Sequence, residues 1–86
     1  MLADREGQVR VRANFPGGVE LLVRPGDTVY RGQGLVIIEG DREVERLSAR
    51  KRAVVVEVKV KEGEEVAEGA LLLVLRELPD EEGGGG

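Results

Sequence analysis

The chain contains no cysteine and no histidine among its 86 residues, and Phe15 and Tyr30 are its only aromatic residues. Without cysteine there are no thiolate nucleophiles or disulfides, and without histidine there is no imidazole acid–base chemistry or common zinc ligand set. Ser48 and Thr28 are the single serine and threonine. Neither has a histidine to accept its proton, which excludes a serine-type triad. An independent enzyme is therefore the least favoured function.

Long hydrophobic runs and an excess of basic charge are also absent. No stretch approaches the roughly 20 apolar residues of a membrane span, and residues 1–6 form no apolar targeting segment. We therefore expect a cytoplasmic protein without a membrane partner. The net charge of −4 and the pI near 4.9 argue against a nucleic-acid partner, because nucleic-acid-binding domains are usually basic.

The length suits one small domain, with polar segments at both ends. Residues 1–7 are mostly polar and charged, and residues 79–86 combine acidic residues with a run of glycine. Neither segment can bury much apolar surface. We expect disorder in both segments and a folded domain over residues 8–78.

The apolar residues between these ends follow a period of two, which is typical of half-buried strands. The alternating sets are Val9, Val11 and Ala13; Val19, Leu21 and Val23; and Val54, Val56, Val58 and Val60. No segment shows a sustained helical stripe, and glycine or proline interrupts the chain every few residues up to Gly40. The pattern predicts an all-β protein.

An internal repeat appears when the chain is shifted by 37 residues onto itself, so that residues 18–35 lie over residues 55–72. Each copy predicts a strand, a turn, a short strand, a second turn and a final apolar strand. The turns fall at glycines, which accept positive φ without steric cost: Gly26, Gly32, Gly63 and Gly69. The predicted fold is a flattened β-barrel or barrel-sandwich hybrid of two quasi-symmetric four-stranded units.

The repeated motif resembles the biotinyl/lipoyl carrier domain family. Residues 26–35 and 63–72 match its twofold pattern of Gly-Asp or Gly-Glu, valine, glycine and leucine, and residues 15–19 resemble its Met-Pro-Gly-x-Val entry. In that family, an acceptor lysine at the tip of a hairpin between the two units carries lipoate or biotin. The resemblance places that hairpin at residues 36–49.

The resemblance places Arg42, flanked by Asp41 and Glu43, where the family carries its acceptor lysine. Lipoate and biotin are attached through an amide to an ε-amine. A guanidinium stays protonated, with a pKa above about 12, and cannot form that bond. Lys51 is the one displaced acceptor candidate. We therefore expect no cofactor.

A run of basic residues over 42–52 forms a possible docking patch for an acidic or phosphate-bearing partner. It contains Arg42, Arg46, Arg50, Lys51 and Arg52. The plainer interpretation is a solvated hairpin tip whose charges discourage pairing between strand edges. Nucleic acid is a weaker candidate, because Phe15 and Tyr30 lie outside the basic run.

Two functional hypotheses follow. The first is a non-catalytic, carrier-like domain without an acceptor lysine, which acts through a protein partner as an accessory to a larger assembly. The second is a genuine swinging-arm carrier of a carboxylase or 2-oxo acid dehydrogenase complex, with lipoate or biotin on Lys51. In the second case, the cofactor supplies the chemistry and the domain supplies presentation.

Overall fold

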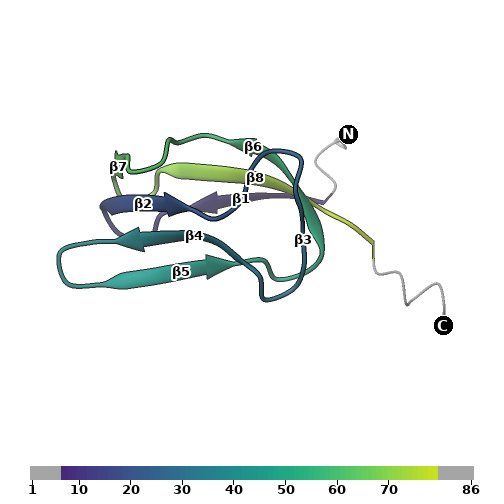
Figure 1. The fold of residues 1–86 in the computed structure, drawn as a ribbon, viewed down its shortest axis with the longest axis horizontal. Helices are drawn as coiled ribbons and strands as arrows, with labels where there is room; N and C mark the ends of the chain where they lie inside the picture. The colour runs from purple at the N-terminus through teal and green to yellow at the C-terminus, as the bar shows by residue number, and fades with distance from the viewer. Residues whose placement is uncertain (1–6, 80–86) are drawn as a thin grey trace.

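The computed structural model describes residues 7–79 and contains eight strands and no helix in that part of the chain (Figure 1). Consequently, no helix there could cross a membrane. The strands are β1 (Gln8–Arg12), β2 (Gly17–Leu21), β3 (Thr28–Val29), β4 (Gly34–Glu39), β5 (Val44–Ser48), β6 (Ala53–Val58), β7 (Glu65–Val66) and β8 (Leu71–Glu77). Disorder was expected for residues 1–7 and 79–86. Of these, residues 1–6 and 80–86 lie outside the described residues, and only Gly7 and Pro79 lie inside them.

The strands form two four-stranded antiparallel sheets, in the orders β1-β8-β6-β3 and β5-β4-β2-β7. Their facing sides bury an apolar core that includes Val29, Leu35, Ile38 and Leu72. The predicted all-β, barrel-sandwich fold is confirmed. In the repeat, β1 to β4 of the first half are equivalent to β5 to β8 of the second half, in the same order. Each sheet contains two strands from each half.

The repeat also appears in the burial of equivalent side chains. Pairs of buried residues occupy matching core positions: Ala13 and Ala49, Val19 and Val55, Val29 and Val66, Leu35 and Leu72, Val36 and Leu73, and Ile38 and Leu75. The pairs up to Val19 and Val55 are 36 residues apart, whereas the later pairs are 37 apart. The second half therefore carries one additional residue.

That additional residue is a β-bulge in β6, and it corrects one sequence-based expectation. The pairing of β6 with β8 shifts register between Val55 and Glu57. Before the bulge, Ala53 and Val55 are buried; at the bulge Val56 is 40% exposed; after it, Val58 packs against the core. The prediction that Val54, Val56, Val58 and Val60 share one buried face is therefore wrong. The extra residue moves the buried face from odd-numbered residues before the bulge to even-numbered residues after it. Strand β6 also ends at Val58, before Lys59.

Four type II turns connect the short strands to their neighbours. In each turn, the N–H of the fourth residue donates to the carbonyl of the first: Asp27 to Arg24, Gln33 to Tyr30, Glu64 to Lys61 and Ala70 to Ala67, at 2.8–3.1 Å. The third residues are Gly26, Gly32, Gly63 and Gly69, with φ of +82° to +92°. A Cβ at these positions would meet nothing within 4 Å. Glycine is required there for its backbone conformation and not for space.

A carboxylate closes the first turn of each half. The backbone N–H of Arg24 donates to Oδ2 of Asp27 at 2.9 Å, and the backbone N–H of Lys61 donates to Oε1 of Glu64 at 2.9 Å. The two carboxylates are equivalent in the repeat. Each one bonds a donor at the start of its turn.

Gly17 lies where two backbone segments approach closely. A Cβ on Gly17 would lie 2.5 Å from the carbonyl oxygen of Glu39. On the neighbouring Gly18, the nearest atom would be 3.6 Å away, at the end of the Glu65 side chain. The end of β4 can therefore lie against the start of β2 only when residue 17 has no side chain.

We expect Gly17→Ala to lower the free energy of unfolding by about 2 kcal/mol, because a backbone carbonyl must move to admit the methyl group. The matched control, Gly18→Ala, should change it by less than about 0.5 kcal/mol. Urea denaturation of both variants measures the difference. Equal losses in the two variants would contradict the close approach.

Replacing either turn carboxylate should cost about 1 kcal/mol of stability, because each substitution removes a hydrogen bond to a backbone N–H. Asp27→Ala and Glu64→Ala should be additive in the double variant, since they act in separate turns. The exposed Glu68→Ala serves as the control and should be near neutral. Thermal unfolding of the four proteins is the measurement. A stability loss in the double variant that differs clearly from the sum of the two single losses would show that the two turns do not close independently.

Candidate functional site

The hairpin of β4 and β5 ends in a two-residue loop made by Asp41 and Arg42. Glu39 pairs with Val44 in the sheet, and the N–H of Gly40 donates to the carbonyl of Glu43 at 2.8 Å. Both loop residues are exposed, and both have negative φ, since the positive-φ residues of the described chain are all glycines outside this loop. The loop therefore differs from the primed turns that two-residue hairpins favour.

The base of the hairpin is held by the loop that precedes β2. A Cβ on Gly40 would lie 2.8 Å from the carbonyl oxygen of Pro16 and 3.1 Å from a ring carbon of Phe15. Phe15 is half-buried and also packs against the core. In addition, the side-chain amide of Asn14 donates to Oε1 of Glu45 on β5 at 2.8 Å. These contacts fix the direction in which the tip projects.

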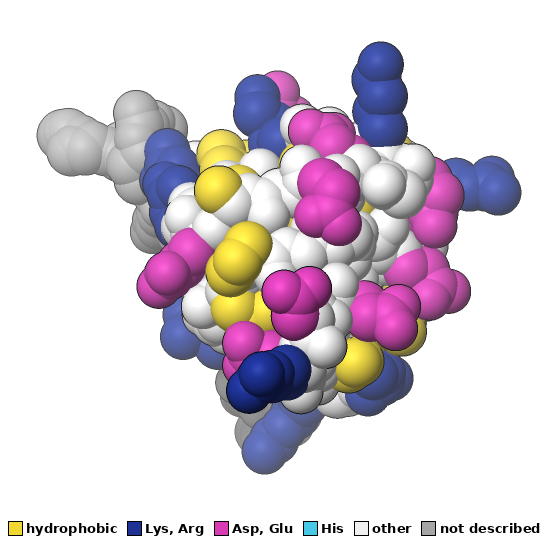
Figure 2. All heavy atoms as spheres, turned by 90° about the vertical axis from the view of Figure 1, so that its left-hand side faces the viewer, with side chains coloured by type: hydrophobic (Ala, Val, Ile, Leu, Met, Phe, Trp, Pro, Cys, Tyr) yellow, Lys and Arg dark blue, Asp and Glu magenta, His cyan; other side chains and the backbone are white. Residues whose placement is uncertain are grey.

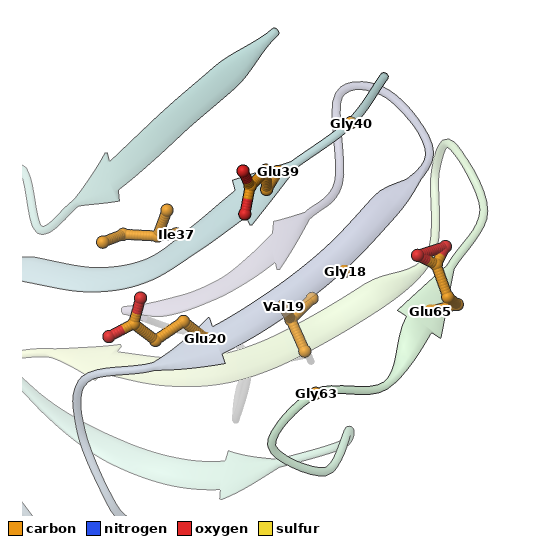
Figure 3. A pocket seen from close by; sticks show the side chains of 8 residues that line it. All are labelled: Gly18, Val19, Glu20, Ile37, Glu39, Gly40, Gly63 and Glu65. Atoms are coloured by element: carbon orange, nitrogen blue, oxygen red, sulfur yellow. The ribbon is translucent and has the colours of Figure 1, made fainter. Parts of the chain in front are cut away.

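Carboxylates surround this end of the molecule. Glu20, Glu39 and Glu65 line a shallow depression of about 420 Å³, with Glu39 and Glu65 on strands either side of β2 (Figure 3). Asp41 and Glu43 line a second depression of about 360 Å³ beside it. Figure 2 looks onto this end and shows carboxylates spread across it. Within residues 7–79, no group of three or more carboxylates could hold a metal ion.

The basic run over 42–52 does not form one surface. Figure 1 shows the turn between β4 and β5 at one end of the molecule and the connection from β5 to β6 at the other. Arg42 lies in the first and Arg50, Lys51 and Arg52 lie in the second. Eight residues of extended chain separate Arg42 from Arg50 by about 26 Å. Arg46 lies between them on β5, where Nη1 donates to Oγ of Ser48 at 3.4 Å.

Two residues that lie outside the basic run in the sequence lie beside residues 50–52 in the structure. Tyr30 and Arg31 line a depression of about 480 Å³ together with residues 50–52. The tyrosine is 56% exposed. Tyr30 is therefore separate from the basic run only along the sequence, and not in space. Only the arrangement of the two halves, and no local motif, brings these segments together.

Arg50, in the connection from β5 to β6, forms an ion pair with the carboxylate of Glu77. Its Nε donates to Oε2 of Glu77 at 2.8 Å, and its Nη2 lies 3.5 Å from Oε1. The hydrogen bond and the charge of Glu77 raise the pKa of the Arg50 guanidinium above its ordinary value. Lys51 is half-buried in the same connection and lines a depression of about 550 Å³ with Gly7 and residues 76–79. It does not lie in a tight hairpin turn.

Comparison with known proteins agrees with this architecture. The model of the biotin-requiring enzyme family, which covers biotin and lipoyl domains, matches residues 7–75. The chain is similar to the dihydrolipoyllysine-residue acetyltransferase component of the pyruvate dehydrogenase complex, with 42% identity over 57 residues in Cupriavidus necator and 38% over 58 residues in Pseudomonas aeruginosa. The matches span 66% and 67% of this chain but only 10% and 11% of those proteins.

Two solved structures share the fold. The lipoyl domain of the 2-oxoglutarate dehydrogenase complex from Azotobacter vinelandii superposes with a TM-score of 0.72 at 31% identity, over 83% of this chain and 99% of that domain. A single-chain, multi-domain long-chain acyl-CoA carboxylase superposes with a TM-score of 0.78 at 26% identity, over 99% of this chain and 8% of the carboxylase.

The fold and the projecting hairpin define a carrier-type domain. The chain belongs to the biotin/lipoyl domain family. The hairpin between its two halves is the candidate functional site.

We expect Phe15→Ala to loosen the hairpin base, because it removes the ring that packs on Gly40. The amide of Gly40 should exchange about tenfold faster, which corresponds to about 1.4 kcal/mol of lost protection. Tyr30→Ala, at the exposed aromatic residue of the opposite end, serves as the control and should leave that amide unchanged. Hydrogen exchange followed by NMR measures both. Unchanged exchange in Phe15→Ala would show that the ring does not hold the hairpin.

Proposed function

We propose that this chain is a non-catalytic, carrier-type domain without an acceptor lysine, and that it acts by protein contact as an accessory module of a larger assembly. The observation that carries this proposal is the residue on the hairpin loop. Arg42 occupies the exposed two-residue loop, after Glu39-Gly40-Asp41, where a lipoyl domain of similar sequence would carry lysine.

The chemistry of Arg42 does not fit covalent attachment of lipoate or biotin. Amide formation needs a neutral amine that attacks an activated carboxyl group. The guanidinium of an exposed arginine stays protonated and delocalised at physiological pH. A cofactor therefore has no attachment point at this loop.

The three lysines of the chain offer poor substitutes for a residue at the tip. Lys51 is half-buried in the connection from β5 to β6, at the opposite end from the hairpin. Lys59 follows β6 and lies 3.6 Å from a carboxylate oxygen of Glu57. Lys61 begins the turn that Glu64 closes. None of them projects from a two-residue loop.

The proteins that this chain resembles support the protein-contact part of the proposal. They are components of multi-domain or multi-subunit enzymes, in which the matched region is a small part of the whole. A domain of this kind that carries no cofactor still has a stable fold and a surface that a partner protein can bind. Contact with a protein partner is the activity that these two properties support.

Intact mass is the direct test. We expect the protein isolated from its own source to have the unmodified mass, and to gain none when incubated with lipoyl or biotin ligase. Arg42→Lys should gain one lipoyl or biotinyl group at residue 42, because the substitution supplies the amine on an existing exposed loop. Peptide mapping locates the adduct.

Two matched variants separate the possible outcomes. Lys51→Arg should leave both results unchanged. An adduct on the natural chain that disappears in Lys51→Arg would overturn the proposal and make the protein a carrier with a displaced arm. An Arg42→Lys protein that stays unmodified would contradict the assignment of residue 42 to the attachment position.

A further inference from the structure

A basic surface lies at the end of the molecule opposite the hairpin. We define the basic end surface as the residues that line the 480 Å³ depression there: Tyr30, Arg31, Arg50, Lys51 and Arg52. It shares no residue with the hairpin loop. The function proposed for the hairpin does not depend on it.

Backbone hydrogen bonds hold the two segments of this surface together. The N–H of Gly32 donates to the carbonyl of Ala49 at 2.8 Å, and the N–H of Ala49 donates to the carbonyl of Gln33 at 2.9 Å. Ala49 itself is 4% exposed and belongs to the core. The turn that contains Tyr30 and Arg31 is therefore fixed beside residues 50–52, and the basic end surface is preformed.

The charge of this surface contrasts with that of the rest of the molecule. Its four cations and the neighbouring Glu77 sum to +3, in a chain whose net charge is −4. Arg50 binds the carboxylate of Glu77 through Nε, and Nη2 of Arg52 donates to the carbonyl of Pro79 at 3.2 Å. Among the described residues, the surface thus already binds a carboxylate and a carbonyl oxygen of its own chain.

Tyr30 adds an apolar contact area among these charges. The residue is 56% exposed, although large aromatic side chains usually gain free energy from burial. Tyrosine and arginine are enriched in protein interfaces, where an aromatic ring supplies contact area and guanidinium groups bind carboxylates. An exposed tyrosine flanked by arginines is the composition of such an interface.

We propose that the basic end surface binds a short acidic segment of a partner protein, with its carboxylates on Arg31 and Lys51 and its backbone across Tyr30. A short segment contacts only this end. A nucleic acid is a longer polyanion that would also run past the acidic remainder of the chain, where repulsion opposes binding. The single aromatic ring also provides little stacking surface for bases.

Fluorescence anisotropy with a short fluorescein-labelled oligoglutamate peptide tests this proposal on the full chain at low ionic strength. We expect measurable binding that weakens about fivefold in the double variant Arg31→Gln, Lys51→Gln, which leaves the Arg50–Glu77 pair intact. The matched control is Arg10→Gln, Lys61→Gln, with the same change of net charge in exposed residues that line neither the hairpin loop nor the basic end surface. It should bind within about twofold of the natural chain.

Further outcomes can overturn the proposal. Equal weakening in both double variants would mean that net charge alone attracts the peptide. Tighter binding of a single-stranded oligonucleotide than of the peptide, lost in the same Arg31, Lys51 variant, would assign the surface to nucleic acid. The triple variant Asp80→Asn, Glu81→Gln, Glu82→Gln should leave peptide affinity unchanged. A clear gain in affinity would assign the surface to this chain's own acidic segment.

Discussion

The structure depends on a reciprocal exchange of backbone hydrogen bonds between its two halves. The N–H of Gly26 donates to the carbonyl of Val55 at 2.7 Å, and the N–H of Val55 donates to the carbonyl of Asp27 at 2.9 Å. The equivalent turn at Gly63 exchanges the same two bonds with Val19. Each buried valine therefore pairs with the turn of the other half, and neither half can satisfy these buried backbone groups alone.

The path of β5 separates the basic residues of the sequence between the two ends of the molecule. Because β5 runs the length of the sheet from the hairpin to the β6 connection, residues close in sequence to Arg42 reach the opposite end. The carboxylates near Glu39 and Glu65 stay at the hairpin end, whereas Arg50 and Lys51 lie with the turn after β3. A rigid sheet separates the two surfaces, and a partner on one leaves the other exposed.

The sequence repeat was sufficient to predict the strands, the turns and the all-β fold, because each depends on local pattern and on glycine positions. It was insufficient for the bulge at Val56, since an uninterrupted run of valines gives no local sign of the extra residue. It also missed the position of Tyr30 beside Lys51, which depends on pairing between halves. The loop residue Arg42 was found from the motif, but its acidic surroundings required the three-dimensional arrangement.

The internal symmetry itself argues that residues of the loop, and not the fold, decide what the hairpin can do. The N–H of Gly40 donates to Glu43 at the hairpin, and at the equivalent place on the opposite end the N–H of Glu77 donates to the carbonyl of Gly7 at 2.6 Å. The same backbone geometry thus occurs twice, once closed by a covalent loop and once between separate strands. Only the closed copy has a loop, which exposes Asp41 and Arg42. Since the fold is common to both ends, the function proposed for the hairpin rests on the loop residue alone: a lysine there would offer an amine for attachment, and Arg42 offers none.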